Sequence, residues 1–115
     1  MTVFTTSTFA KSDATNTITL TDGSTGTGVK YNRHQIAIDA GDNTSGTITV
    51  LCTPKGAAST EAVYENGSAL VINLATSGEP ETRTDIKGII ESFAFTFASL
   101  GGSDTVTITI SSWIE

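Results

Sequence analysis

A short alternation of apolar residues with threonine recurs along this chain and constrains its fold more than any other feature. It appears as NTITLT at residues 16–21, as GTITVL at 46–51 and as DTVTITI at 104–110. An alternation with a period of two places apolar side chains on one face of a β-strand and hydroxyls on the other. Because the copies are irregularly spaced, they indicate half-buried strands rather than a structural repeat.

Other alternating stretches, separated by clusters of Gly, Asn, Asp and Ser, extend the pattern over most of the chain. The 115 residues include 22 Thr and 12 Ser, which suit the solvent face of antiparallel sheets. We therefore expect an all-β fold: a single antiparallel β-sandwich domain, Ig-like or jelly-roll-like, of about seven to nine strands over residues 1–115. Helix should be limited to about one turn.

The sharpest local signal is Asn66-Gly67 between two apolar stretches. Asn-Gly is favoured where both central residues of a type I′ turn need positive φ, so residues 60–74 are expected to form a hairpin. The polar segment at 75–85, which contains Pro80, is expected to be a long surface connection.

Three phenylalanines at a spacing of two, Phe93, Phe95 and Phe97, indicate the central core strand. Val106, Ile108 and Ile110 are expected to face them. A further apolar set is expected opposite, namely Ile48, Val50, Leu70 and Ile72.

Strict alternation places Trp113 on the face of Thr105, Thr107 and Thr109, not on the face of Val106. Two explanations are open. Either Ser111-Ser112 forms a bulge that turns the indole inward, or the indole is offered to a partner.

Charge and hydropathy exclude several classes of function. Six Lys and Arg against 12 Asp and Glu give a net charge of −6, and the cations are scattered singly, so nucleic-acid binding is not expected. No apolar run approaches the roughly 20 residues that span a bilayer, and no signal peptide is recognisable, so neither a membrane nor secretion is expected. A single Cys52 excludes an intrachain disulfide.

The residues that could carry chemistry all have structural explanations. The only histidine, His34, is expected at the surface or at a strand end, since no nucleophile lies near it in sequence. Cys52 shares a face with Ile48 and Val50, as a buried small hydrophobe would. The loop from Asp39 to Asn43 offers oxygen ligands for Ca²⁺ but lacks EF-hand spacing, and Asp and Asn also stabilise turns without a metal. We therefore expect no catalytic residue, no cofactor and no metal, and no enzymatic activity.

The C-terminal half carries a resemblance to a known group of proteins. The hairpin at Asn66-Gly67, the segment DIKGIIESFAFTF at 85–97, the glycine loop at 101–104 and VTITISSW at 106–113 together resemble small all-β virion proteins of tailed bacteriophages. The likeness covers roughly residues 62 to 114. It implies a structural role in the virion, after synthesis in the host cytoplasm, as a capsid decoration or cement protein or as a neck or tail component.

Such a role implies self-association as a homo-oligomer and contact with other virion proteins, such as the major capsid protein. The candidate contact residues are those whose apolar side chains do not fit one buried face, in a possible contact arm at 1–10 and at the C-terminus: Val3, Phe4, Phe9, Trp113 and Ile114. A carbohydrate-binding or adhesin-like module is the alternative, with Tyr31, Tyr64 and Trp113 as its sugar-stacking platform.

Overall fold

A computed structural model describes residues 2–10, 16–20, 31–54, 57, 59–77 and 81–114. The side chains of Thr2, Val3, 76–77 and 81–85 lie outside the described set. The elements in chain order are β1 (Thr2–Phe9), β2 (Asn16–Thr19), β3 (Arg33–Asp39), β4 (Thr47–Pro54), β5 (Glu61–Ala62), β6 (Tyr64–Glu65), β7 (Ser68–Ala69), β8 (Val71–Asn73), α1 (Leu74–Ser77), β9 (Glu81–Lys87), β10 (Ile90–Ala98) and β11 (Val106–Trp113).

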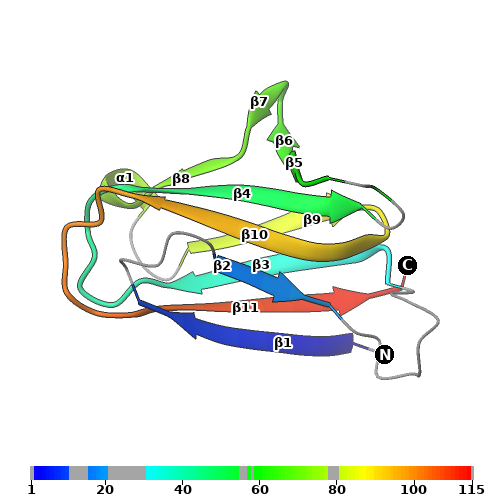
Figure 1. Ribbon diagram of the computed structural model, residues 1–115, viewed down its shortest axis with the longest axis horizontal. Helices are drawn as coiled ribbons and strands as arrows, with labels where there is room; N and C mark the ends of the chain where they lie inside the picture. The colour runs from blue at the N-terminus through cyan, green and yellow to red at the C-terminus, as the bar shows by residue number, and fades with distance from the viewer. Residues whose placement is uncertain are drawn as a thin grey trace.

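The strands form two antiparallel layers, which can be followed in Figure 1. One sheet has the order β1-β11-β3-β9. The other has the order β2-β10-β4-β5, with β8 also paired to β4. The expectation of an all-β antiparallel sandwich is confirmed, and the only helix among the described residues is the single turn α1.

The connections identify the kind of sandwich. In chain order, β4, β5 and β8 follow one another within one sheet, with the hairpin of β6 and β7 between β5 and β8, whereas every other connection passes from one layer to the other. The first strand pairs with the last, β1 with β11, over the whole of β1. This order of crossings, with two interleaved Greek keys, is that of a jelly roll.

The core between the layers is aliphatic and aromatic. Phe93 and Phe95 are fully enclosed, while Phe97 is partly buried. As expected, Val106, Ile108 and Ile110 contribute the buried face of the other sheet. One expectation is wrong: Ile48, Val50 and Ile72 do not lie opposite the phenylalanines but in the same sheet, because β4 pairs with both β10 and β8.

The expected hairpin is confirmed. Asn66 and Gly67 have φ values of 53° and 83°, as a type I′ turn requires, and β6 pairs with β7 around them. The hairpin interrupts a strand, since β5 and β8 on either side of it both pair with β4. Its base is closed by Leu70, whose N–H donates to the Val63 carbonyl at 2.6 Å. The hairpin therefore projects from the sandwich, as Figure 1 shows.

The expected surface connection at 75–85 is partly wrong. Residues 81–87 form β9, which pairs with β3 at the edge of the first sheet. The alternation of β9 was hard to recognise for two reasons. An edge strand needs less apolar surface than a central one, and a register shift opposite His34 and Ile36 interrupts the pattern along β9.

Candidate functional site

Strand register brings part of the expected contact set together at one end of β1 and β11. Thr2 lies opposite Trp113 and Phe4 lies opposite Ser111, so the Phe4 and Trp113 positions are diagonal neighbours on one face. Phe4 is 68% exposed and Ile114 is 60% exposed. We call Phe4, Trp113 and Ile114 the end patch.

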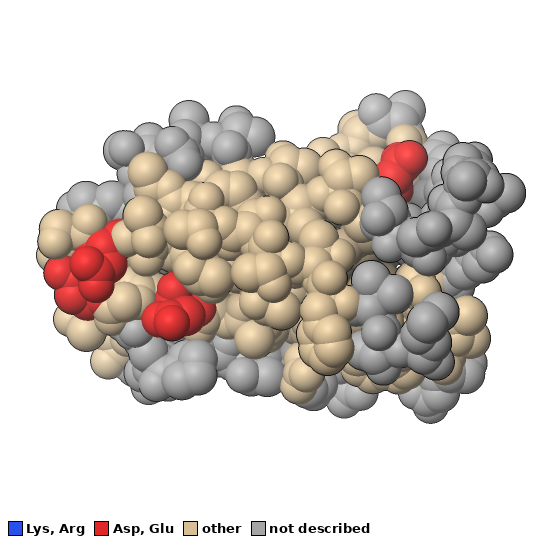
Figure 2. All heavy atoms as spheres, turned by 90° about the horizontal axis from the view of Figure 1, so that it is seen from below, with Lys and Arg blue, Asp and Glu red and all other residues tan. Residues whose placement is uncertain are grey.

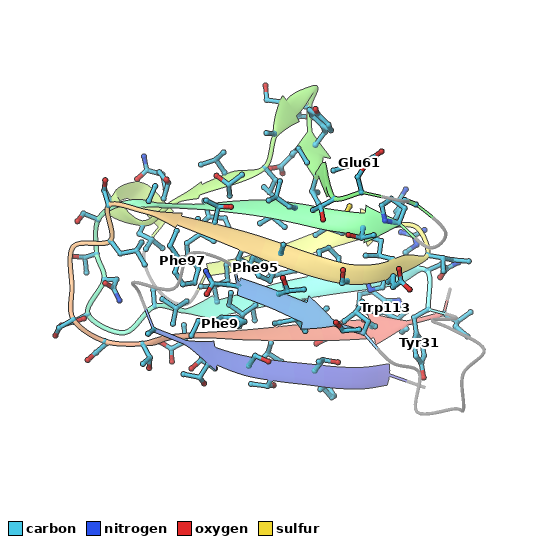
Figure 3. The ribbon with its side chains drawn as sticks, in the orientation of Figure 1. Phe9, Tyr31, Glu61, Phe95, Phe97 and Trp113 are labelled. Atoms are coloured by element: carbon cyan, nitrogen blue, oxygen red, sulfur yellow. The ribbon has the colours of Figure 1, made fainter. Side chains whose placement is uncertain are left out.

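The alternation of β11 excludes one of the two explanations for Trp113, the bulge at Ser111-Ser112. Its burial pattern is unbroken from Val106 to Trp113, and its pairing with β1 and β3 runs without a register shift. No bulge turns the indole inward. Trp113 therefore lies half-buried on the outer face, at the end of the sheet away from Phe9 (Figure 3).

The possible contact arm and the rest of the expected contact set have a different placement. Residues 2–9 form an edge strand rather than an arm that extends from the domain. Phe9 packs against the core and meets Phe97 edge to face, with ring centroids 6.3 Å apart. The side chain of Val3 lies outside the described residues.

Beyond the end patch, the outer face of β1 and β11 is lined by threonine hydroxyls. The Thr6 and Thr109 hydroxyls lie 3.0 Å apart, and so do those of Thr8 and Thr107. These cross-strand pairs lie on the same face as Phe4, because side chains two residues apart share a face. The face thus combines an apolar end with an uncharged, hydroxylated middle.

His34 is not at the surface, contrary to expectation. It is fully buried on β3, where Ser112 lies opposite it on β11. Its Nδ1 is 2.8 Å from the Ser112 hydroxyl and its Nε2 is 3.0 Å from the Gly88 carbonyl. Since a carbonyl only accepts, Nε2 carries the proton and Nδ1 accepts the Ser112 O–H. Phe93 packs edge to face on the ring, with centroids 5.5 Å apart.

Ser112 and His34 lie within the hydrogen-bond distance of a catalytic nucleophile and its base, but they are not exposed to a substrate. Ser112 is 3% exposed and points into the core, so a substrate has no access to its hydroxyl. Burial lowers the pKa of His34 by disfavouring the imidazolium, although the bond to the Gly88 carbonyl acts in the opposite direction. This is a structural polar pair inside the core. Ser112 could have been found from sequence, since it continues the inward parity of Val106 and Ile110.

Cys52 is half-buried at the margin of the core. Burial raises the pKa of its thiol, and the negative charge of Glu61 raises it further. A raised pKa keeps the sulfur in the thiol form, which is the less nucleophilic one.

The loop from Asp39 to Asn43 is bonded to the loop before β11. The Asp42 carboxylate accepts the N–H groups of Ser103 and Asp104, both at 2.8 Å, and these bonds hold its pKa below the usual range. Asn43 is fully buried; its amide donates to the carbonyls of Ala40 and Asp104 and accepts the Gly102 N–H. We call this arrangement the loop clasp. The Asp42 carboxylate and the Asn43 amide thus bond to backbone groups of the protein. Within the described ranges, no group of three His, Cys, Asp or Glu side chains is placed to hold a metal ion.

Of the residues expected to form a sugar-stacking platform, Tyr64 is 67% exposed on the projecting hairpin. Sequence reasoning missed Ile89, between β9 and β10, which is 47% exposed. No helix among the described residues is long and apolar enough to cross a membrane.

Comparison of the sequence with protein-family models and with curated proteins gave no match.

Proposed function

We propose that this chain is a non-catalytic structural protein of a tailed-phage particle that acts through repeated surface contacts, as decoration or cement on the capsid. The observation that carries the proposal is the end patch, where the Phe4 and Trp113 positions are diagonal neighbours on the outer face of β1 and β11 and the exposed Ile114 follows Trp113. Exposed aromatic and aliphatic side chains that gather in one place are typical of protein contact surfaces.

Two further observations support the proposal. The residues best suited to catalysis are engaged in the fold: His34 is enclosed and Asp42 holds two loops together. The jelly roll is also a fold that viral capsid domains use, along with lectins and cupins. Fold alone does not fix function, so the virion setting rests on the resemblance across residues 62–114.

The capsid is preferred to the neck or tail because one compact sandwich without a coiled coil or shaft repeat is sufficient to bridge neighbouring shell subunits. Many modest contacts repeated over a lattice add up by avidity. The alternative is a carbohydrate-binding or adhesin-like module. Trp113 could stack on a sugar ring beside the polar side chains of β3, but Tyr31 is buried and Tyr64 lies on the projecting hairpin, which divides the expected platform.

The test compares particles assembled with and without the protein. If the protein acts as cement, particles that contain it should survive heating or chelation that opens particles without it. A Phe4→Ser, Trp113→Ser double variant should bind particles more weakly, while Val71→Ser, on another exposed apolar side chain, should not. Equal resistance of both particles would argue against cementing, and absence from the capsid surface would remove the decoration role. Specific glycan binding by the isolated chain would favour the adhesin-like alternative.

A further inference from the structure

The edges of the two sheets differ in how they are protected against pairing with another strand. Natural proteins protect edges with short strands, charges, Pro or bulges. In the described part of the fold, β9 carries four charged residues and a register shift, β2 has four residues, and β5 and β8 have two and three.

The remaining edge, β1, has none of these protections. It has eight residues, TVFTTSTF, without a charge or Pro, and it pairs with β11 without a register shift. Its β-branched and aromatic residues favour extended pairing. Figure 2 views the molecule from the side on which β1 lies in Figure 1. Uncharged atoms cover the middle of this side, and no Lys or Arg of the described residues is visible there.

We propose that β1 is the contact between two copies of this chain, which pair antiparallel through their β1 edges to form one continuous eight-stranded sheet. This rests on the proposed function in one respect, because a lattice role requires contacts between copies. The new statement is the partner and the geometry: strand addition about a two-fold axis.

The pattern of side chains fits such a two-fold axis. When Thr6 lies opposite its own copy, Phe4 lies opposite Thr8, so outward side chains meet outward side chains. The Thr109–Thr6 hydroxyl row then continues into the same row of the second copy. A strand without charge meets its copy without local repulsion, although the whole chain carries −6.

Charge along the strands favours the antiparallel over the parallel arrangement. The sheet row of Thr2 and Trp113 continues to Arg33 and Lys87. The row of Thr8 and Thr107 continues to Asp39, and the loop clasp, with further carboxylates, lies at the same end. Antiparallel pairing places the acidic end of one copy beside the basic end of the other, whereas parallel pairing would place acid beside acid.

The test uses the isolated chain and the exposed, central residue of β1. Sedimentation should show a dimer that dissociates on dilution. Thr6→Lys and Thr6→Glu should each raise the dissociation constant at least about fivefold, since like charges then face each other across the strand pair. An equimolar mixture of the two variants should restore association. The matched control is Thr96→Lys, at an exposed position on β10 in the interior of the other sheet, and it should leave association unchanged.

Hydrogen exchange supplies a second readout. Amides of Thr2–Phe9 should gain protection as the protein concentration rises. A chain that stays monomeric up to about 1 mM, equal weakening by Thr96→Lys, a mixture that fails to associate, or protection confined to another segment would each overturn the pairing. A monomeric chain that still binds particles would overturn only this pairing, whereas a β1-paired dimer absent from particles would overturn only the virion role.

Discussion

Phe9 of β1 and Phe97 of β10 meet edge to face across the two sheets, with their ring planes at 69° (Figure 3). The pair ties the N-terminal strand of one layer to a central strand of the other. β1 therefore contributes to folding as well as offering an edge, and a deletion of residues 1–10 would remove both contributions.

Phe9→Ala is expected to lower the free energy of unfolding by about 1–3 kcal/mol, because it removes partly buried area and the aromatic pair. Chemical denaturation measures the change. Phe4→Ala is the control on the same strand, and its exposed side chain should cost no more than about 0.5 kcal/mol. Equal losses for the two variants would show that Phe9 is not a packing residue.

Phe95→Ala should cost roughly 3–5 kcal/mol, since its ring is 1% exposed between the layers. The same denaturation experiment checks this value. A loss below about 1 kcal/mol would contradict the placement of this ring in the core.

His34 should make stability depend on pH. Its folded pKa lies below the ordinary value of 6.5, so just below that pH the unfolded chain binds more protons than the folded one. The contribution is fully present above pH 6.5 and is lost as the pH falls toward the folded pKa. Denaturation curves between pH 7.5 and 5.5 should show a fall that is smaller in His34→Gln, which does not titrate in this range. Parallel pH profiles of the two proteins would contradict the assignment.

Asn43→Ala should destabilise the fold by about 2–3 kcal/mol, because it leaves the Gly102 N–H without this acceptor and the Ala40 and Asp104 carbonyls without this donor. Thermal unfolding measures the loss. Thr44→Ala, at the exposed neighbouring position, serves as the control and should change little. Equal melting temperatures for Asn43→Ala and Thr44→Ala would contradict the stabilising role of the loop clasp.

Local alternation was enough to predict the sandwich, because one face of each main strand is buried. It identified Phe93 and Phe95 on β10, the buried face of β11 and the turn at Asn66-Gly67. It did not identify β9, whose pattern is broken by a register shift and whose edge position demands little apolar surface.

Contacts between strands far apart in sequence were not accessible to this reasoning. Ser112 and Gly88 lie 78 and 54 residues from His34, so the sequence near the histidine gave no sign that both ring nitrogens are bonded. The end patch was predicted only in part. The sequence singled out Phe4, Phe9, Trp113 and Ile114 together, whereas the separation of Phe4 from Phe9 follows from their opposite parity on one strand.

The hairpin of β6 and β7 makes this sandwich a natural display scaffold. Val63 and Leu70 close its base with backbone bonds to each other and to Val50, so the strand on either side keeps its register with β4 whatever the intervening loop contains. Foreign peptides grafted in place of residues 64–69 should thus be presented away from the layers without disturbing them. Were the chain arrayed on a shell, each copy would present one such graft outward from its own sandwich.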